Sequence, residues 1–150
     1  MKTEINPSYI GILQLYSYYA LDSLSQVHFI GKGEPWFIKE NGQDGYPKNY
    51  LIGLVISFQE CFNYLEYDND TLVLANKLLY FLTDQLRHGD GSFFTKEAIL
   101  HSNDWVWIRE TASKILYLLD YYPVNIKKPL DIYNFIEPYD YIVKLNKKWR

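Results

Sequence analysis

The chain has 150 residues, a formal net charge of −3 and a single cysteine. One cysteine excludes an internal disulfide framework, and this length fits one domain that buries roughly two-thirds of its unfolded surface. Residues 1–20 lack the basic start and unbroken apolar core of a secretory signal, and no apolar run approaches the ~18–20 residues of a membrane span. We therefore expect a single cytoplasmic domain over residues 1–150, without a membrane partner.

Charge is distributed unevenly along the chain. Residues 58–104 hold eight acidic and three basic side chains, a net −5, whereas residues 121–150 hold three acidic and six basic ones, a net +3. Phosphate binding needs clustered Lys and Arg. The acidic middle of the chain therefore argues against direct nucleic-acid binding and favours a basic protein partner.

The strongest helical signal is near residues 70–88, where apolar side chains cover most of the helix circumference. A helix that is apolar on so many sides is normally surrounded by other elements. We therefore predict that this helix is the most buried one and that Phe81 lies in the core. Asp68, Asn69 and Asp70 offer N-cap oxygens and negative charge at its start.

Three further main helices are predicted from apolar residues at helical spacing, near residues 8–24, 49–67 and 104–121. Asn103 or Asp104 is expected to cap the last of them. The short link after residue 67 predicts that helix 49–67 pairs antiparallel with helix 70–88.

The remaining segments are predicted to be shorter or irregular. Residues 27–39 contain two strand-like runs around glycines and form a possible small hairpin. A short helix is expected at 95–101, and short C-terminal helices at 130–136 and 139–148. The fold class that follows is mostly α, a single-domain bundle of about four main helices plus short C-terminal helices.

Candidates for chemistry are few. His88, Asp90, His101 and Asp104 lack metal-ligand spacing, and Cys61 has no nearby His or Lys that would activate it. Acidic residues at helix starts need no catalytic explanation. We expect no catalytic residue, no metal, no cofactor and no enzymatic activity.

Surface recognition is the remaining signal. Trp107 lies about 120° from the centre of the apolar stripe of its helix, at 100° per residue. It is therefore either an exposed anchor for a partner or covered by residues 95–101 or by the tail. Leu15 and Tyr18 of the first helix are likewise either buried by another element or exposed for a partner, and burial is favoured. The sequence leaves the oligomeric state open.

The chain resembles, in general character, the immunity proteins of bacterial contact-dependent and other polymorphic toxin systems. The likeness consists of size, one domain, the absence of a catalytic motif, candidate exposed aromatic residues, and an acidic middle that contains Asp68, Asp70, Asp84 and Asp104. It implies a cytoplasmic protein that neutralises a cognate toxin, commonly a basic nuclease, by binding it.

The surface predicted to bind such a basic partner combines carboxylates with aromatic anchors. Its members are Glu60, Glu66, Asp68, Asp70, Asp104, Trp107 and Tyr117. Two alternatives stay open. One is a helical carrier of a small molecule or lipid, whose many rings line a cavity, and the other is an enzyme with a site near residues 25–48.

Overall fold

Helix α1, Ile10–Ala20, is the most buried element of the protein. The structure is a computed structural model, and it describes residues 2, 9–31 and 47–131. Eight of its eleven residues are buried. The elements that follow it along the chain are α2 Ser23–His28, α4 Lys48–Cys61, the 3-10 helix η3 Phe62–Tyr64, α5 Asn69–His88, α6 Lys96–His101 and α7 Asn103–Leu118. The predicted mostly α bundle is confirmed, and the described residues contain no strand.

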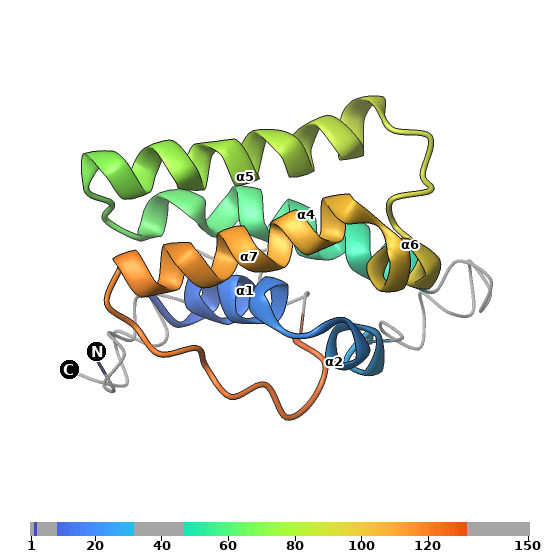
Figure 1. Ribbon diagram of the computed structural model, residues 1–150, viewed down its shortest axis with the longest axis horizontal. Coiled ribbons are helices and arrows are strands. Elements are labelled where there is room, and N and C mark those ends of the chain that lie inside the picture. Colours follow the sequence, from blue (N-terminus) through green and yellow to red (C-terminus); the bar gives the residue numbers. More distant parts are fainter. Residues whose placement is uncertain (1, 3–8, 32–46, 132–150) are drawn as a thin grey trace.

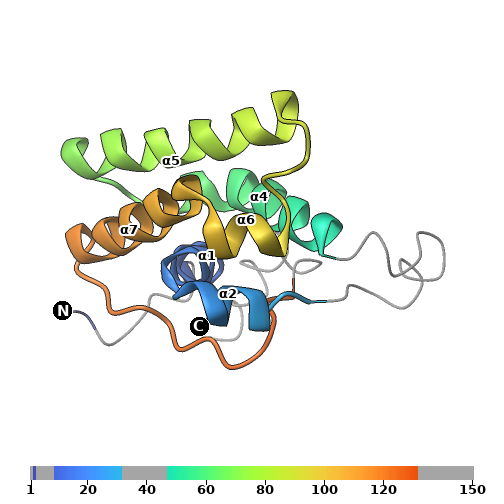
Figure 2. The same cartoon turned by 45° about the vertical axis from the view of Figure 1, so that its right-hand side comes forward.

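The helices are stacked in layers (Figure 1). Helix α5 forms one outer edge of the molecule, α4 and α7 lie between α5 and α1, and residues 121–131 cross the opposite side of α1. As predicted, α4 and α5 run antiparallel, and α7 is also antiparallel to α5. Figure 2 shows the same order from a second direction. Within residues 9–31 and 47–131, no helix is both long and apolar enough to cross a bilayer.

The prediction that helix 70–88 is the most buried one is wrong. Only four of the twenty residues of α5 are buried, namely Thr71, Ala75, Leu78 and Leu82. Phe81 is half-buried, between the rings of Phe93 and Trp107. The physical reason is that α5 packs on α4 and α7 with one face only, so its other apolar side chains lie at the margin of the core or in solvent.

The burial predicted for Leu15 and Tyr18 is confirmed, because other elements cover both sides of α1. The first helix is shorter than the predicted range 8–24 and ends at Ala20. Asp22 then starts α2 by accepting a hydrogen bond of 2.9 Å from the backbone N–H of Ser25. Such a local cap competes with continuation of the preceding helix.

The possible hairpin at 27–39 is contradicted where the structure describes it. Val27 and His28 belong to α2, and residues 29–31 form no strand. Residues 32–46 lie outside the described part of the chain. The same holds for most of the predicted helix 130–136 and all of 139–148, while Leu130 and Asp131 are not helical.

The later helices differ from prediction mainly at their ends. The predicted helix 49–67 is divided into α4 and η3, which ends at Tyr64. Ser102, rather than Asn103 or Asp104, caps α7 by accepting from the Asp104 N–H at 3.1 Å. Helix α7 ends at Leu118 instead of near residue 121.

The end of α7 is a Schellman motif. The N–H of Asp120 donates to the Tyr117 carbonyl at 3.0 Å, and that of Tyr121 donates to the Leu116 carbonyl, also at 3.0 Å. Asp120 occupies the position that favours glycine, with φ 64°. The motif turns the chain so that Tyr122 and the residues after it leave the helix axis and return along α1.

Aromatic rings make up a large part of the core. Phe58 contacts Tyr16, Tyr19 and Phe62 at centroid distances of 5.2, 5.8 and 5.7 Å. A second group stacks Trp105 on Phe93 at 4.8 Å, and the Trp105 Nε1–H donates to the Phe93 carbonyl at 3.0 Å. Tyr19 joins the two groups through Trp105. The sequence contains 15 Tyr, 8 Phe and 4 Trp, and these contacts show that part of this aromatic content serves interior packing.

Residues 121–130 cover the side of α1 that faces away from α7. The backbone N–H of Val124 donates to the buried Ser17 hydroxyl at 2.7 Å. The Tyr50 hydroxyl donates to the Leu130 carbonyl at 2.8 Å, and Ile126 and Leu130 are buried. A segment without helix or strand thus completes the core on this side of α1.

Candidate protein-binding surface

Four of the predicted carboxylates lie at one end of the bundle. Glu60 is in the last turn of α4, Glu66 and Asp68 are in the link, and Asp70 is in the first turn of α5. All four are exposed, and none pairs with a basic side chain in the part of the chain that the structure describes. Negative potential is therefore concentrated at this end.

Asp68 has a structural role in addition. Its carboxylate accepts a hydrogen bond of 2.8 Å from the backbone N–H of Thr71 and caps α5. The hydrogen bond from the Thr71 backbone N–H lowers the pKa of Asp68 below its usual value. The group therefore stays ionised at neutral pH, but its substitution would also disturb the helix start.

The fifth member of this end is Tyr117. Phe81 of α5 and Trp107 of α7 are in ring contact at 5.3 Å. Thr71 lies ten residues before Phe81 on α5, and Tyr117 lies ten residues after Trp107 on α7, which is about 15 Å along each helix. Because the two helices are antiparallel, both displacements point the same way, and Thr71 and Tyr117 are level along the bundle. Tyr117 is 68% exposed.

Two further exposed apolar residues follow Tyr117 along the chain, and the sequence did not assign either of them to the binding surface. Leu118 is exposed, and Tyr122 is 53% exposed. The sequence places Tyr122 in register with the apolar stripe of the predicted helix 104–121. Helix α7 ends earlier, at Leu118, so Tyr122 does not continue that stripe. We call the group of Glu60, Glu66, Asp68, Asp70, Tyr117, Leu118 and Tyr122 the acidic end surface.

Asp104 and Trp107 do not join the acidic end surface. Asp104 lines a pocket with Gln85, which lies fifteen residues along α5 from Asp70, a distance of roughly 22 Å along the helix axis. Trp107 is half-buried and packs on Phe81, so it is not a free anchor. The seven predicted residues therefore belong to two separate regions, because α5 and α7 are antiparallel.

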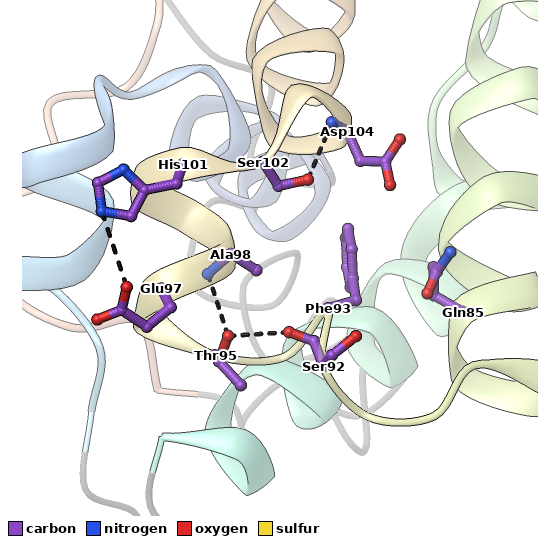
Figure 3. A pocket seen from close by; sticks show the side chains of 9 residues that line it. All are labelled: Gln85, Ser92, Phe93, Thr95, Glu97, Ala98, His101, Ser102 and Asp104. Carbon is purple, nitrogen blue, oxygen red and sulfur yellow. Dashed lines mark hydrogen bonds and ion pairs between the residues drawn. The ribbon is translucent and has the colours of Figure 1, made fainter.

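The pocket that contains Asp104 is a shallow hollow of about 670 Å³ between the end of α5, α6 and the start of α7 (Figure 3). Its hydroxyl groups serve turns and caps. Thr95 donates to the Ser92 carbonyl at 2.8 Å and accepts from the Ala98 N–H at 3.1 Å. The imidazole of His101 lies 3.7 Å from the Glu97 carboxylate, and both side chains are largely exposed.

The described residues show no arrangement of nucleophile and base. Burial, with a smaller contribution from Glu60, raises the pKa of the Cys61 thiol to about 12, so the thiol stays protonated. The Ser92 hydroxyl donates to Asp90 at 2.6 Å within a turn. Among residues 9–31 and 47–131, no three side chains of His, Cys, Asp or Glu are placed to hold a metal ion.

The alternative of a carrier predicts aromatic rings around a cavity. The rings of the described core pack against one another at centroid distances of 4.8 to 6.3 Å. The alternative of an enzyme near residues 25–48 falls mostly on residues 32–46, which the structure does not describe.

No protein-family model, curated protein or solved structure matches this chain.

Proposed function

We propose that this protein acts by binding a basic protein at the acidic end surface. The observation that carries the proposal is that exposed Tyr117, Leu118 and Tyr122 lie at the same end of the bundle as four carboxylates that have no basic partner in the described part of the chain. Exposed aromatic and aliphatic groups rimmed by charge are typical of protein-binding surfaces. The general resemblance to immunity proteins suggests a toxin domain, commonly a nuclease, as the partner.

The carboxylates and the apolar residues contribute to different steps of binding. A concentrated negative potential accelerates the encounter with a cationic partner and makes the association rate depend on salt. Tyr117 and Tyr122 offer rigid apolar area with a polar tip, and such residues often dominate the dissociation rate. Neutralisation of a toxin follows if the bound surface of the partner includes its active site.

The test compares two variants that change the net charge equally. The first reverses Glu60, Glu66 and Asp70 to Lys and leaves Asp68 in place as the cap of α5. The control reverses three exposed acidic residues elsewhere, Glu97, Asp104 and Glu110. We expect the first variant to associate with the captured partner at least tenfold more slowly at low salt, and the control to associate at nearly the wild-type rate.

The partner itself is found by capture on the wild-type protein from the source organism, followed by co-expression of the two genes. The proposal predicts a basic protein whose toxicity is relieved by the wild type and much less by the first variant. A partner that tolerates reversal of Glu60, Glu66 and Asp70 and binds independently of salt would refute the assignment to this surface. A partner that is not basic would refute the proposed partner class.

A further inference from the structure

The outer face of α5 carries two exposed apolar side chains that no described element covers. Val73 and Tyr80 lie seven residues apart on this face and are 58% and 67% exposed. In both views α5 is the outermost of the described helices on its side of the bundle (Figures 1 and 2). A side chain as large as tyrosine, exposed at the middle of the longest described helix, contributes little to folding.

A groove lies beside Tyr80, between α4 and α5. Its volume is about 460 Å³, and it is lined by Gln59, Leu79, Tyr80, Thr83 and Arg87. The Gln59 amide donates to the Thr83 hydroxyl at 2.9 Å and holds the two helices together at its base. Exposed Ile56 lies one turn before Gln59 on α4 and extends the apolar area.

Charges on the same face of α5 are self-complementary about Tyr80. Lys77 precedes Tyr80 by three residues, and Asp84 follows it by four. When two copies of a helix pack antiparallel about a two-fold axis, a residue before the axis faces the residue that follows the axis by a similar number of positions. Lys77 of each copy would therefore face Asp84 of the other.

The arrangement continues outward from the axis. Asp70 and Arg87 lie ten residues before and seven residues after Tyr80, within one turn of equivalent positions. None of the four charged residues forms an ion pair in the described part of the chain. Across the axis, Lys77 would face Asp84 and Asp70 would face Arg87, so each pair combines opposite charges. A uniformly basic or acidic partner would be repelled by two of these four residues.

We propose that two copies of this chain associate through the outer face of α5, with Tyr80 at the two-fold axis and its ring against the groove of the other copy. The contact consists of one helix face and one groove, so it lies at the small end of stable interfaces and gives a dimer of roughly micromolar affinity. This inference does not depend on the proposed function, although Asp70 borders both surfaces.

Sedimentation velocity across a wide range of protein concentration measures the dimerisation constant. Lys77→Glu and Asp84→Lys each place like charges opposite one another twice per dimer, and we expect each to weaken dimerisation at least tenfold. The double variant restores the opposite signs with exchanged positions and should return to within a few-fold of the wild type. Lys114→Glu, on the exposed face of α7, is the matched control and should have no effect.

The substituted positions are exposed, so circular dichroism should show unchanged helicity in every variant. Tyr80→Ala provides a second measurement that does not alter charge, and it should also shift the protein toward the monomer. A wild-type protein that remains monomeric at every concentration would overturn the proposal. A double variant as weak as the product of the two single variants would overturn the pairing of Lys77 with Asp84.

Discussion

Arg109 of α7 donates a hydrogen bond of 3.0 Å to the side-chain oxygen of Gln26, which lies eighty-three positions earlier in the chain and is fully buried. The same guanidinium nitrogen donates to the Ile99 carbonyl at 3.1 Å. The Gln26 amide nitrogen in turn donates to the carbonyls of Tyr18 and Tyr19 at 3.2 and 2.9 Å. The Gln26 side chain thus donates to carbonyls in the last turn of α1 and connects α2 to α7 through Arg109. Arg109 also connects α7 to α6.

Gln26→Ala should therefore destabilise the protein more than the replacement of an exposed polar side chain does. It leaves the Tyr19 carbonyl and part of the Arg109 guanidinium without their Gln26 partner, whereas the Tyr18 carbonyl keeps its hydrogen bond from the Leu21 N–H. Unsatisfied buried groups cost about 1–3 kcal/mol each. We expect a loss of roughly 2–4 kcal/mol in the free energy of unfolding, measured with urea. Asn63→Ala, an exposed control, should change it by less than about 0.5 kcal/mol. A loss for Gln26→Ala as small as that of the control would contradict this role.

The position of α1 at the centre predicts an order of stability for two aromatic truncations. Phe58 is fully buried and contacts three other rings, whereas Phe81 is half-buried on the outer helix. Phe58→Ala should cost about 3–5 kcal/mol, and Phe81→Ala should cost clearly less because it removes less buried area. Thermal and urea unfolding measure both. The reverse order would indicate that α5 is the centre of the core after all.

Gly31 should not tolerate even a methyl group. A Cβ at this position would lie 2.6 Å from a Tyr50 ring carbon and 3.1 Å from the Pro129 Cβ. The Tyr50 ring cannot move freely, because its hydroxyl donates to the Leu130 carbonyl. We expect Gly31→Ala to cost about 1–3 kcal/mol and to accelerate amide exchange in residues 121–130. The double variant with Tyr50→Phe frees the ring and should recover part of the loss.

Asp120→Gly should stabilise the protein. Asp120 has φ 64°, a conformation that costs an ordinary L-residue about 1–2 kcal/mol and costs Gly almost nothing. The substitution also removes a negative charge from the C-terminal end of α7. We expect a gain of roughly 0.5–1 kcal/mol, seen as a higher Tm. Asp120→Ala loses the same charge without gaining freedom, so a Tm for Ala equal to that of Gly would rule out the conformational explanation.

The cap of α5 should depend on pH. The pKa of Asp68 is lowered in the folded state, chiefly by the hydrogen bond from the Thr71 backbone N–H. A lowered pKa of an acid stabilises the fold above the unfolded value of about 3.9, and this contribution is lost as pH falls through the folded value. The stability of the wild type relative to Asp68→Asn, which keeps an acceptor without titrating, should therefore decrease below about pH 4. Urea unfolding from pH 6 to pH 2.5 tests this dependence, and a difference that is constant with pH would contradict it.

The sequence alone determined the features that depend on neighbouring residues. The apolar spacing predicts the helical class and the approximate positions of α4, α5 and α7, and Asp68 is the cap of α5 because its oxygen reaches a donor three residues away. The antiparallel pairing of α4 and α5 follows from the shortness of the link between them. Local hydrogen bonding and chain length decide each of these points.

The tertiary structure alone decided which helix lies at the centre and which surface residues meet. Leucine-rich α5 is the better centre by composition, but α1 is the more buried helix. Its Tyr18 hydroxyl donates to the Gln26 carbonyl of α2, and its Ser17 hydroxyl accepts from the Val124 N–H. Asp104 is separated from Asp70 by the antiparallel packing of α5 and α7, and exposed Tyr122 leaves the predicted stripe because of the turn at Asp120. Burial depends on what the rest of the chain places against a side chain, and this cannot be read from the spacing of residues within one helix.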